Sequence, residues 1–183
     1  MNTPNGIDPQ MISNPPYYVQ GRKIQPIDVI EGWSFCHHLG CVVKYVARLG
    51  RKSAGRQNPI LEDLKKAEWY LMREITEKSC LYMPRLRRFP MMPEAIAKDW
   101  QLSSSLKEVI FYLTTYQRLF CRFPLTKTIC LKQALTHLRA EIKSQESASN
   151  QNQQPTVLGA NIIIFKDTRV KDVCTKGRNP CSD

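Results

Sequence analysis

The stretch S-F-C-H-H-L-G-C-V-V-K-Y-V-A-R-L-G-R-K, residues 34–52, has the periodicity of an amphipathic helix. Its large apolar residues recur at intervals of four, three, four and three, which places them on one helical face: Phe35, Leu39, Val42, Val46 and Leu49. Gly50 then supplies the residue that most often ends a helix. The stretch therefore predicts a helix that packs one side against a hydrophobic core.

A second face of the same helix is polar and basic, and Tyr45 lies near the border between the two faces. This second face carries His37, Cys41, Lys44 and Arg48. Most lysines and arginines on helices are solvated surface charges. Taken alone, the stretch does not indicate a ligand site.

The sequence resembles itself after a shift of 67 residues. When residues 26–75 are compared with residues 93–142 without a gap, 12 of the 50 positions are identical. Composition alone gives roughly 3 such identities. The identical pairs include Pro26/Pro93, Trp33/Trp100, Leu39/Leu106, Val42/Val109, Tyr45/Tyr112 and Leu71/Leu138. We interpret the match as an internal duplication of a three-helix unit.

The duplication predicts an all-α protein in which two three-helix pseudo-repeats pack into one bundle. A flexible C-terminal tail with one short strand-like segment, residues 162–165, should follow the bundle. We expect five parts in order: an extended arm (1–16), the first repeat (17–78), a second, degenerate repeat (79–143), a disordered linker (144–156) and the tail (157–183).

The two repeats differ at a set of charged positions. The second repeat has uncharged residues where the first has charges: Asp28/Ala95, Lys44/Phe111, Arg48/Thr115, Lys52/Leu119 and Asp63/Cys130. Charges that the fold required should have survived with the fold. We therefore expect Lys44, Arg48, Lys52 and Asp63 to serve a ligand. As exposed charges, they should rarely contribute more than about 1 kcal/mol each to stability.

The composition favours an anionic partner. The formal net charge is +11, and residues 77–143 carry 12 Lys and Arg against 5 Asp and Glu. Such a balance favours nucleotides or nucleic acid. No apolar run approaches the length that spans a bilayer, and no secretion signal opens the chain, so we expect a cytoplasmic protein without a membrane partner. Seven cysteines without a C-x-x-C pair predict neither a disulfide framework nor a metal site.

Residues 15–75 contain four motifs that point to a family. They are P-P-Y-Y (15–18), I-x-P-I-D-V-I-E (24–31), K-Y-x-x-R-x-x-x-K (44–52) and E-D-L-K-K-A-x-x-Y-L (62–71). In these motifs the chain resembles a small phage-associated family that is catalogued as a domain of unknown function, one lineage of which is described as a nucleotide kinase. Two positions depart from the family's pattern: Tyr17 stands where the family usually has His, and Cys41 where it usually has Asn.

The resemblance implies a nucleotide-binding protein, or a nucleoside monophosphate kinase without a P-loop, because the sequence lacks G-x-x-x-x-G-K-[ST]. Lys44, Arg48 and Lys52 would then hold phosphates, and Asp63 would orient them or bind a hydroxyl group. Tyr17, Tyr18 or His37 would bind the base, with Asp28 in the same charged set. A kinase would also need ATP or another phosphate donor.

A second interpretation stays open. The chain could instead be a non-enzymatic basic helical protein that binds nucleic acid or a protein partner. The excess charge of residues 77–143 would then form the contact surface, with Arg85, Arg87, Arg88, Arg118 and Arg122. The sequence does not decide which nucleotide binds, or whether the chain assembles into a homo-oligomer.

Overall fold

The part of the chain that the computed structural model describes, residues 12–52, 55–77, 91–119 and 124–151, is built from α-helices. No residue in these ranges belongs to a β-strand, so the predicted all-α class is confirmed. The helices are α2 (Pro16–Val19), α3 (Pro26–Gly32), α4 (His37–Arg48), α5 (Pro59–Glu77), α6 (Pro93–Trp100), α7 (Ser104–Arg118) and α8 (Pro124–Gln151). The strand-like segment and the tail lie outside the described residues, as does most of the expected arm.

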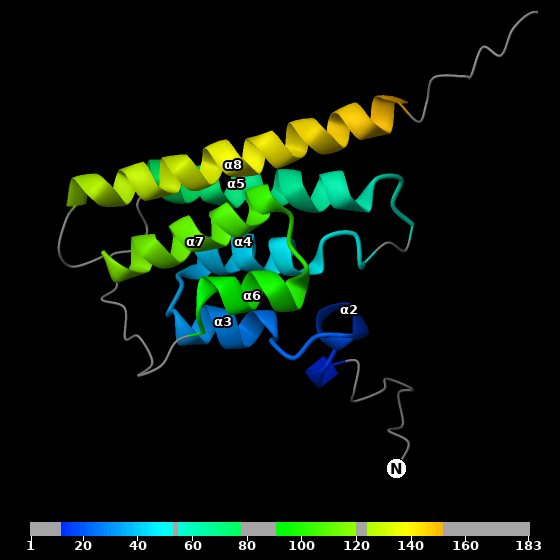
Figure 1. Cartoon of the computed structure of the whole chain (residues 1–183), viewed down its shortest axis with the longest axis horizontal. Helices are drawn as coiled ribbons and strands as arrows, with labels where there is room; N and C mark the ends of the chain where they lie inside the picture. The colour runs from blue at the N-terminus through cyan, green and yellow to red at the C-terminus, as the bar shows by residue number, and fades with distance from the viewer. Residues whose placement is uncertain (1–11, 53–54, 78–90, 120–123, 152–183) are drawn as a thin grey trace, which may run out of the picture. The chain divides into compact units, whose positions relative to one another are not determined.

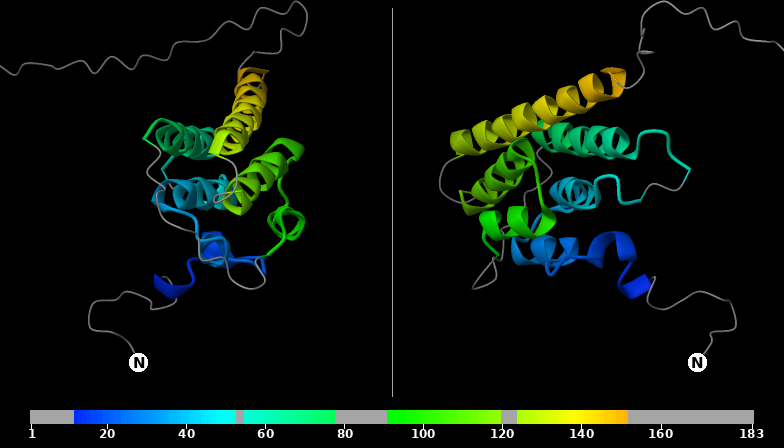
Figure 2. Two further views of the ribbon diagram at one scale, coloured as in Figure 1. Left: turned by 90° about the vertical axis from the view of Figure 1, so that its left-hand side faces the viewer. Right: turned by 45° about the vertical axis from the view of Figure 1, so that its right-hand side comes forward.

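The six longer helices lie in three layers (Figures 1 and 2). Helices α3 and α6 form one outer layer, α4 and α7 the middle layer, and α5 and α8 the other outer layer. Each layer therefore combines one helix from each half of the sequence. None of the helices in the described ranges has both the length and the hydrophobicity to cross a membrane.

The helices of the two halves begin at corresponding positions. Helices α3 and α6 begin at Pro26 and Pro93, which are 67 residues apart. Proline suits the first turn because its missing N–H would have no partner there. Helices α4 and α7 begin at His37 and Ser104, again 67 residues apart.

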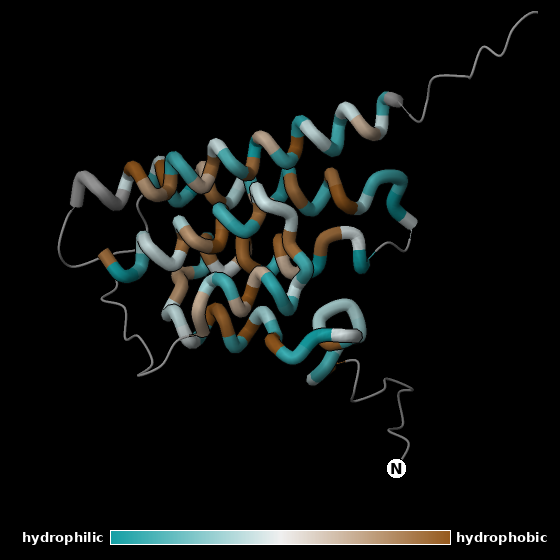
Figure 3. The backbone as a smooth tube through the Cα atoms, in the orientation of Figure 1, coloured by the Kyte–Doolittle hydropathy of each residue, from teal (hydrophilic) through white to brown (hydrophobic). Residues whose placement is uncertain are grey.

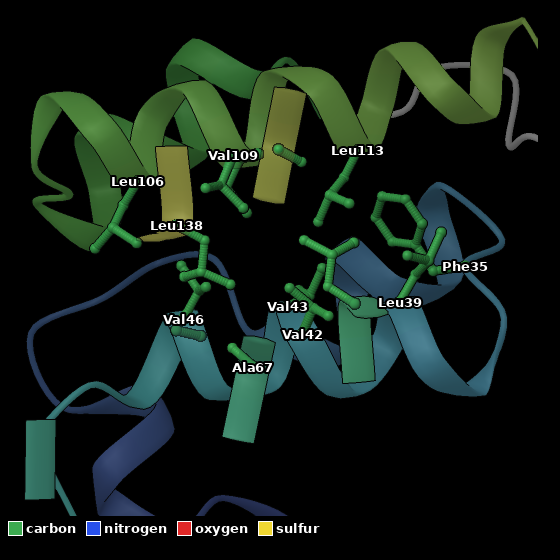
Figure 4. Close-up of a cluster of buried hydrophobic side chains, with 14 of the residues drawn as sticks. Phe35, Leu39, Val42, Val43, Val46, Ala67, Leu106, Val109, Leu113 and Leu138 are labelled. Carbon is green, nitrogen blue, oxygen red and sulfur yellow. The ribbon is translucent and has the colours of Figure 1, made fainter. Parts of the chain in front are cut away.

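The hydrophobic core lies between the two halves. Leu39, Val42 and Val46 of α4 face Leu106, Val109 and Leu113 of α7 (Figure 4). Along each helix, hydrophobic residues alternate with hydrophilic ones at the helical period (Figure 3). The apolar face predicted for residues 34–52 is therefore the buried face, and Phe35 lies just before the helix begins.

The two core tryptophans make matching contacts. Nε1 of Trp33 donates a hydrogen bond to the carbonyl oxygen of Met91 at 2.9 Å. Nε1 of Trp100 donates to the carbonyl oxygen of Ile24 at 2.8 Å. Met91 and Ile24 are themselves 67 residues apart, so each half donates to the equivalent carbonyl of the other half.

Other contacts repeat in the same way. Ser34 and Gln101, 67 residues apart, both have a positive φ, at 51° and 54°. In the first half Cys36 donates to Glu74, and in the second half Ser103 donates to Glu141. The ring of Tyr45 stacks on Tyr70, as that of Tyr112 stacks on His137. These matches support our interpretation of the fold as two pseudo-repeats related by duplication.

The linker predicted for residues 144–156 is wrong over its first part, because α8 continues to Gln151. The polar side chains that suggested disorder have partners on or near α5. Glu146 pairs with Lys65 at 2.9 Å, and Ser149 accepts a hydrogen bond from Asn58 at 3.0 Å. The remainder of the expected linker lies outside the described residues.

The matching tryptophan contacts predict that Trp33 and Trp100 contribute similarly to the free energy of unfolding. Trp33→Phe and Trp100→Phe each remove an indole donor from a carbonyl between the halves. We expect each variant to lose about 1–3 kcal/mol of unfolding free energy, since a buried acceptor loses its partner. Urea unfolding measures this loss. Trp69→Phe is the control, because Trp69 is 54% exposed and its loss should stay below about 0.5 kcal/mol. A large loss in one core variant and none in the other would contradict the equivalence.

Candidate functional site

The centre of the candidate site is the buried carboxylate of Asp63 on α5. Its Oδ1 accepts hydrogen bonds from Nη2 of Arg48 and from Nη1 of Arg56, each at 2.9 Å. Asp63 has no exposed surface, and Arg48 is only 9% exposed. Burial acts to lower the pKa of Arg48, but the hydrogen bond and charge of Asp63 outweigh burial and raise that pKa. Arg48 is therefore charged and held in one place.

Aromatic rings surround the Arg48 guanidinium and its neighbouring lysines. Arg48 lies over the ring of Tyr45, 4.7 Å from its centroid, and Nζ of Lys44 lies 5.0 Å from the same centroid. Burial raises the pKa of the Tyr18 hydroxyl, and the positive charge of Arg48 opposes this rise. The contacts of Arg48 and Lys44 with Tyr45 are cation–π interactions, which hold cations beside a ring without neutralising them.

The N-terminal segment brings two tyrosines to the same place. Tyr17 and Tyr18 of α2 contact each other edge to face, with ring centroids 4.5 Å apart. Nζ of the exposed Lys52 lies 5.5 Å from the ring centroid of Tyr17. Two helices and a loop separate these tyrosines from Asp63 in the sequence, yet the same cluster of cations contacts both.

Two buried polar atoms of the central pair have no hydrogen-bond partner among the described residues: Nε of Arg48 and Oδ2 of Asp63. Buried polar groups of proteins are nearly always hydrogen-bonded, so each such atom needs an explanation. Nε can only donate, and a carboxylate oxygen can only accept. The pair therefore leaves one buried donor and one buried acceptor unsatisfied among the described residues, as do Nε of Arg22 and Oε1 of Gln117 elsewhere in the fold.

Two pockets flank α2. The first, which we call the Lys44 pocket, has a volume of about 300 Å³. Its lining is mostly apolar, with Tyr18 and Lys44 at one part of the wall and Pro15, Pro26, Ile27 and Ile30 among the rest. The second, the Arg51 pocket, has a volume of about 520 Å³ and is lined by Pro16, Tyr17, Gln20 and Arg51. Consecutive residues of one short segment thus line both pockets.

Six of the eight residues singled out in the sequence form a connected cluster. They are Tyr17, Tyr18, Lys44, Arg48, Lys52 and Asp63. His37 is linked to them only through aromatic neighbours, because its ring contacts Tyr70 and Tyr70 stacks on Tyr45. Asp28 has a structural role instead. Its carboxylate accepts a hydrogen bond from the backbone N–H of Gln25 at 3.3 Å and caps α3.

Arg56, Tyr45 and Tyr70 are part of the site, although the sequence did not identify any of them as a site residue. Arg56 was visible as part of the basic loop after α4, but nothing in that loop's composition showed which of its cations would reach Asp63. Tyr45 and Tyr70 are 25 residues apart, and only the pairing of α4 with α5 stacks them.

The expectation that the charged set is exposed is wrong for Arg48 and Asp63. Both are buried, whereas Lys44 is partly buried and Lys52 is exposed. The corresponding positions of the second half hold Thr115 and the buried Cys130, without a charge. The same helix pair therefore packs with small neutral residues at these positions. Phe111, the counterpart of Lys44, is 41% exposed, so the second half does not bury a hydrophobic side chain at this position.

The residues of the site lie in the part of the chain that matches a family model. Residues 12–72 match the family model for a protein of unknown function (DUF3310). This match covers about a third of the chain, including α2 to α4 and most of α5, and the second half lies outside it. No curated protein and no solved structure matches the chain.

The central pair predicts a strong energetic coupling. Arg48→Thr and Asp63→Cys introduce the residues found at the equivalent positions of the second half. Each single change removes one partner of a buried ion pair, so we expect each to cost about 3–5 kcal/mol of unfolding free energy. The double variant leaves no buried charge in the pair. It should therefore lose clearly less than the sum of the two single losses.

A double-mutant cycle measured by denaturant unfolding tests this coupling. The variants Thr115→Ala and Lys107→Ala, on α7, are controls for changes that touch no ion pair of the site. Single losses that simply add in the double variant would contradict a coupled Arg48–Asp63 pair.

Proposed function

We propose that this site binds a nucleotide and holds its phosphate between Lys44, Arg48 and Lys52. The observation that carries the proposal is the Arg48 guanidinium. Asp63 fixes one of its edges at 2.9 Å, and its buried Nε has no acceptor among the described residues. A guanidinium presents donors in a rigid planar fork that matches phosphate oxygens. An anionic oxygen that displaces the side chains covering Arg48 would satisfy this donor.

The charge around Arg48 favours a phosphate with two negative charges over an anion with a single charge. Lys44 shares the Tyr45 ring with Arg48, and Lys52 and Arg56 approach from the loop after α4. Asp63 and Glu62 are the acidic residues that pair with these arginines. The cations outnumber the acids, so a group with two negative charges is stabilised more than one with a single charge.

The Lys44 pocket favours a ligand with an uncharged part attached to its phosphate. Its volume of about 300 Å³ lies at the lower end of the range for small-molecule sites. Apolar side chains form most of the wall, and Lys44 and Tyr18 connect it to the Arg48 cluster. A nucleoside in this pocket would place its phosphate beside the cations.

The second half of the chain supports a ligand-related role for the charges. It packs the equivalent helices with Thr115 and Cys130 in place of Arg48 and Asp63. A buried ion pair is often no better for stability than neutral residues of similar volume. A role in orienting Arg48 toward an anion explains why the pair is present in one half only.

Binding of nucleotides should depend on Lys44. We expect Lys44→Phe, which introduces the residue of the equivalent position 111, to weaken nucleoside monophosphate binding about tenfold or more, because a charge-assisted contact contributes about 1.5–3 kcal/mol. Isothermal titration calorimetry against nucleoside mono- and triphosphates measures the affinity. Lys107→Phe is the matched control, since it removes an exposed lysine from α7 outside the site. The proposal fails if the wild type binds no nucleotide, or if the two variants bind equally well.

The Arg51 pocket favours a second candidate, phosphoryl transfer. It lies across α2 from the Lys44 pocket, so two nucleotides could occupy the two sides of one segment. In such a reaction an oxygen of the acceptor's phosphate would attack the γ-phosphorus of ATP, and ADP would leave as a nucleoside diphosphate forms. Chromatography of a mixture of the protein, ATP, Mg²⁺ and a nucleoside monophosphate detects that product. Arg51→Ala should slow its formation and leave monophosphate affinity unchanged. A wild type that binds both nucleotides and forms no diphosphate would exclude this candidate.

A further inference from the structure

Aromatic rings extend from the phosphate site across the surface of α5. Tyr45 stacks on Tyr70 with a centroid distance of 5.9 Å, and Tyr70 contacts Trp69 edge to face at 4.8 Å. Trp69 is 54% exposed, which is unusual for so large an apolar side chain. Tyr18 interacts with Arg48, and Tyr17 contacts Tyr18. We call these five residues, Tyr17, Tyr18, Tyr45, Tyr70 and Trp69, the aromatic strip.

Cations accompany the strip along its length. Lys52 lies over Tyr17, Lys44 and Arg48 lie over Tyr45, and Arg73 lies over Trp69 at 5.3 Å from the ring centroid. The acids nearby are already ion-paired. Glu77 pairs with Arg73, and Glu62 pairs with Lys66 and Arg56. Cations therefore lie over three of the five rings of the strip: Tyr17, Tyr45 and Trp69.

The packing of α5 does not explain why an exposed tryptophan, Trp69, stands at the end of the strip. The buried face of α5 consists of Asp63, Leu64, Ala67, Leu71 and Glu74, and Trp69 is not part of it. In the second half, the positions equivalent to Trp69 and Arg73 hold the exposed residues Thr136 and Ala140. The helix pair thus forms without a tryptophan or an arginine at these places. The stacked pair in the middle of the strip has a counterpart in Tyr112 and His137, but the exposed tryptophan at its end, like the central ion pair, occurs only in the first half.

We propose that the aromatic strip binds single-stranded nucleic acid, with one phosphate at the Arg48 site and the following nucleotides directed toward Trp69. The proposal rests on the phosphate site described above and extends its ligand from one nucleotide to several. Bases stack on exposed aromatic rings whatever their sequence, while cations between the rings contact the phosphates. A row of rings with cations over both of its ends and its middle matches this polymer, which carries a phosphate for each base.

The test compares thymidine 5′-monophosphate with single-stranded thymidylate oligomers of two to about six nucleotides, a length within the usual site size of such surfaces. Affinity measured by calorimetry should rise with length and then level off. Trp69→Thr, which introduces the residue of position 136, should weaken the longest oligomer about tenfold and leave the mononucleotide unchanged. Trp69→Phe should retain most of the affinity, since it keeps an aromatic ring. Lys44→Phe should weaken both ligands.

The outcomes separate this inference from the nucleotide site itself. If the mononucleotide binds and affinity does not rise with length, the strip is no binding surface and the nucleotide site stands. If Trp69→Thr and Trp69→Phe weaken the oligomer equally, stacking on Trp69 is excluded. If neither ligand binds the wild type, both proposals fall. Circular dichroism of each variant confirms that the comparison is made between folded proteins, and Arg73→Ala provides a second test of the same end of the strip.

Discussion

The buried carboxylate of Asp63 is the constraint on which the first half of the structure depends. A charge without solvent must be paired, and Asp63 finds its partners on α4 and in the loop that follows it. The pair therefore joins α4, α5 and the connecting loop at one point. It also decides where the Arg48 guanidinium lies relative to Tyr45 and Tyr18, and hence which surface of the molecule is positively charged.

The two halves show which features belong to the fold and which do not. Both have buried tryptophans with matching hydrogen bonds, matching helix starts and a matching pair of stacked rings. These features maintain the three layers. The ion pair, the surrounding lysines and the exposed Trp69 occur in the first half alone. We interpret this division as the result of a duplication in which the first half carries the groups of the proposed binding site.

The sequence predicted the helices well because burial imposes a period on it. Leu39, Val42, Val46 and their counterparts in the second half recur at helical spacing and are all buried. The cluster of Lys44, Arg48, Lys52 and Asp63 could be recognised because the second half lacks it. The burial of Arg48 could not be predicted from the sequence. An arginine beside an apolar helix face has the same sequence spacing whether its side chain points to water or to a buried carboxylate. The end of α8 was missed for a related reason: polar residues appear disordered in a sequence until their partners on α5, such as Lys65, are known.

The most direct test of this account observes the Arg48 side chain while a nucleotide is added. A ¹H–¹⁵N correlation spectrum of the arginine Nε–H groups, with the Arg48 signal assigned from an Arg48→Lys variant, follows the donor that has no partner among the described residues. The account predicts that a nucleoside monophosphate shifts this signal and that the shift saturates at the concentration at which calorimetry shows full binding. An Arg48 signal that stays in place while the nucleotide binds would show that the phosphate lies elsewhere.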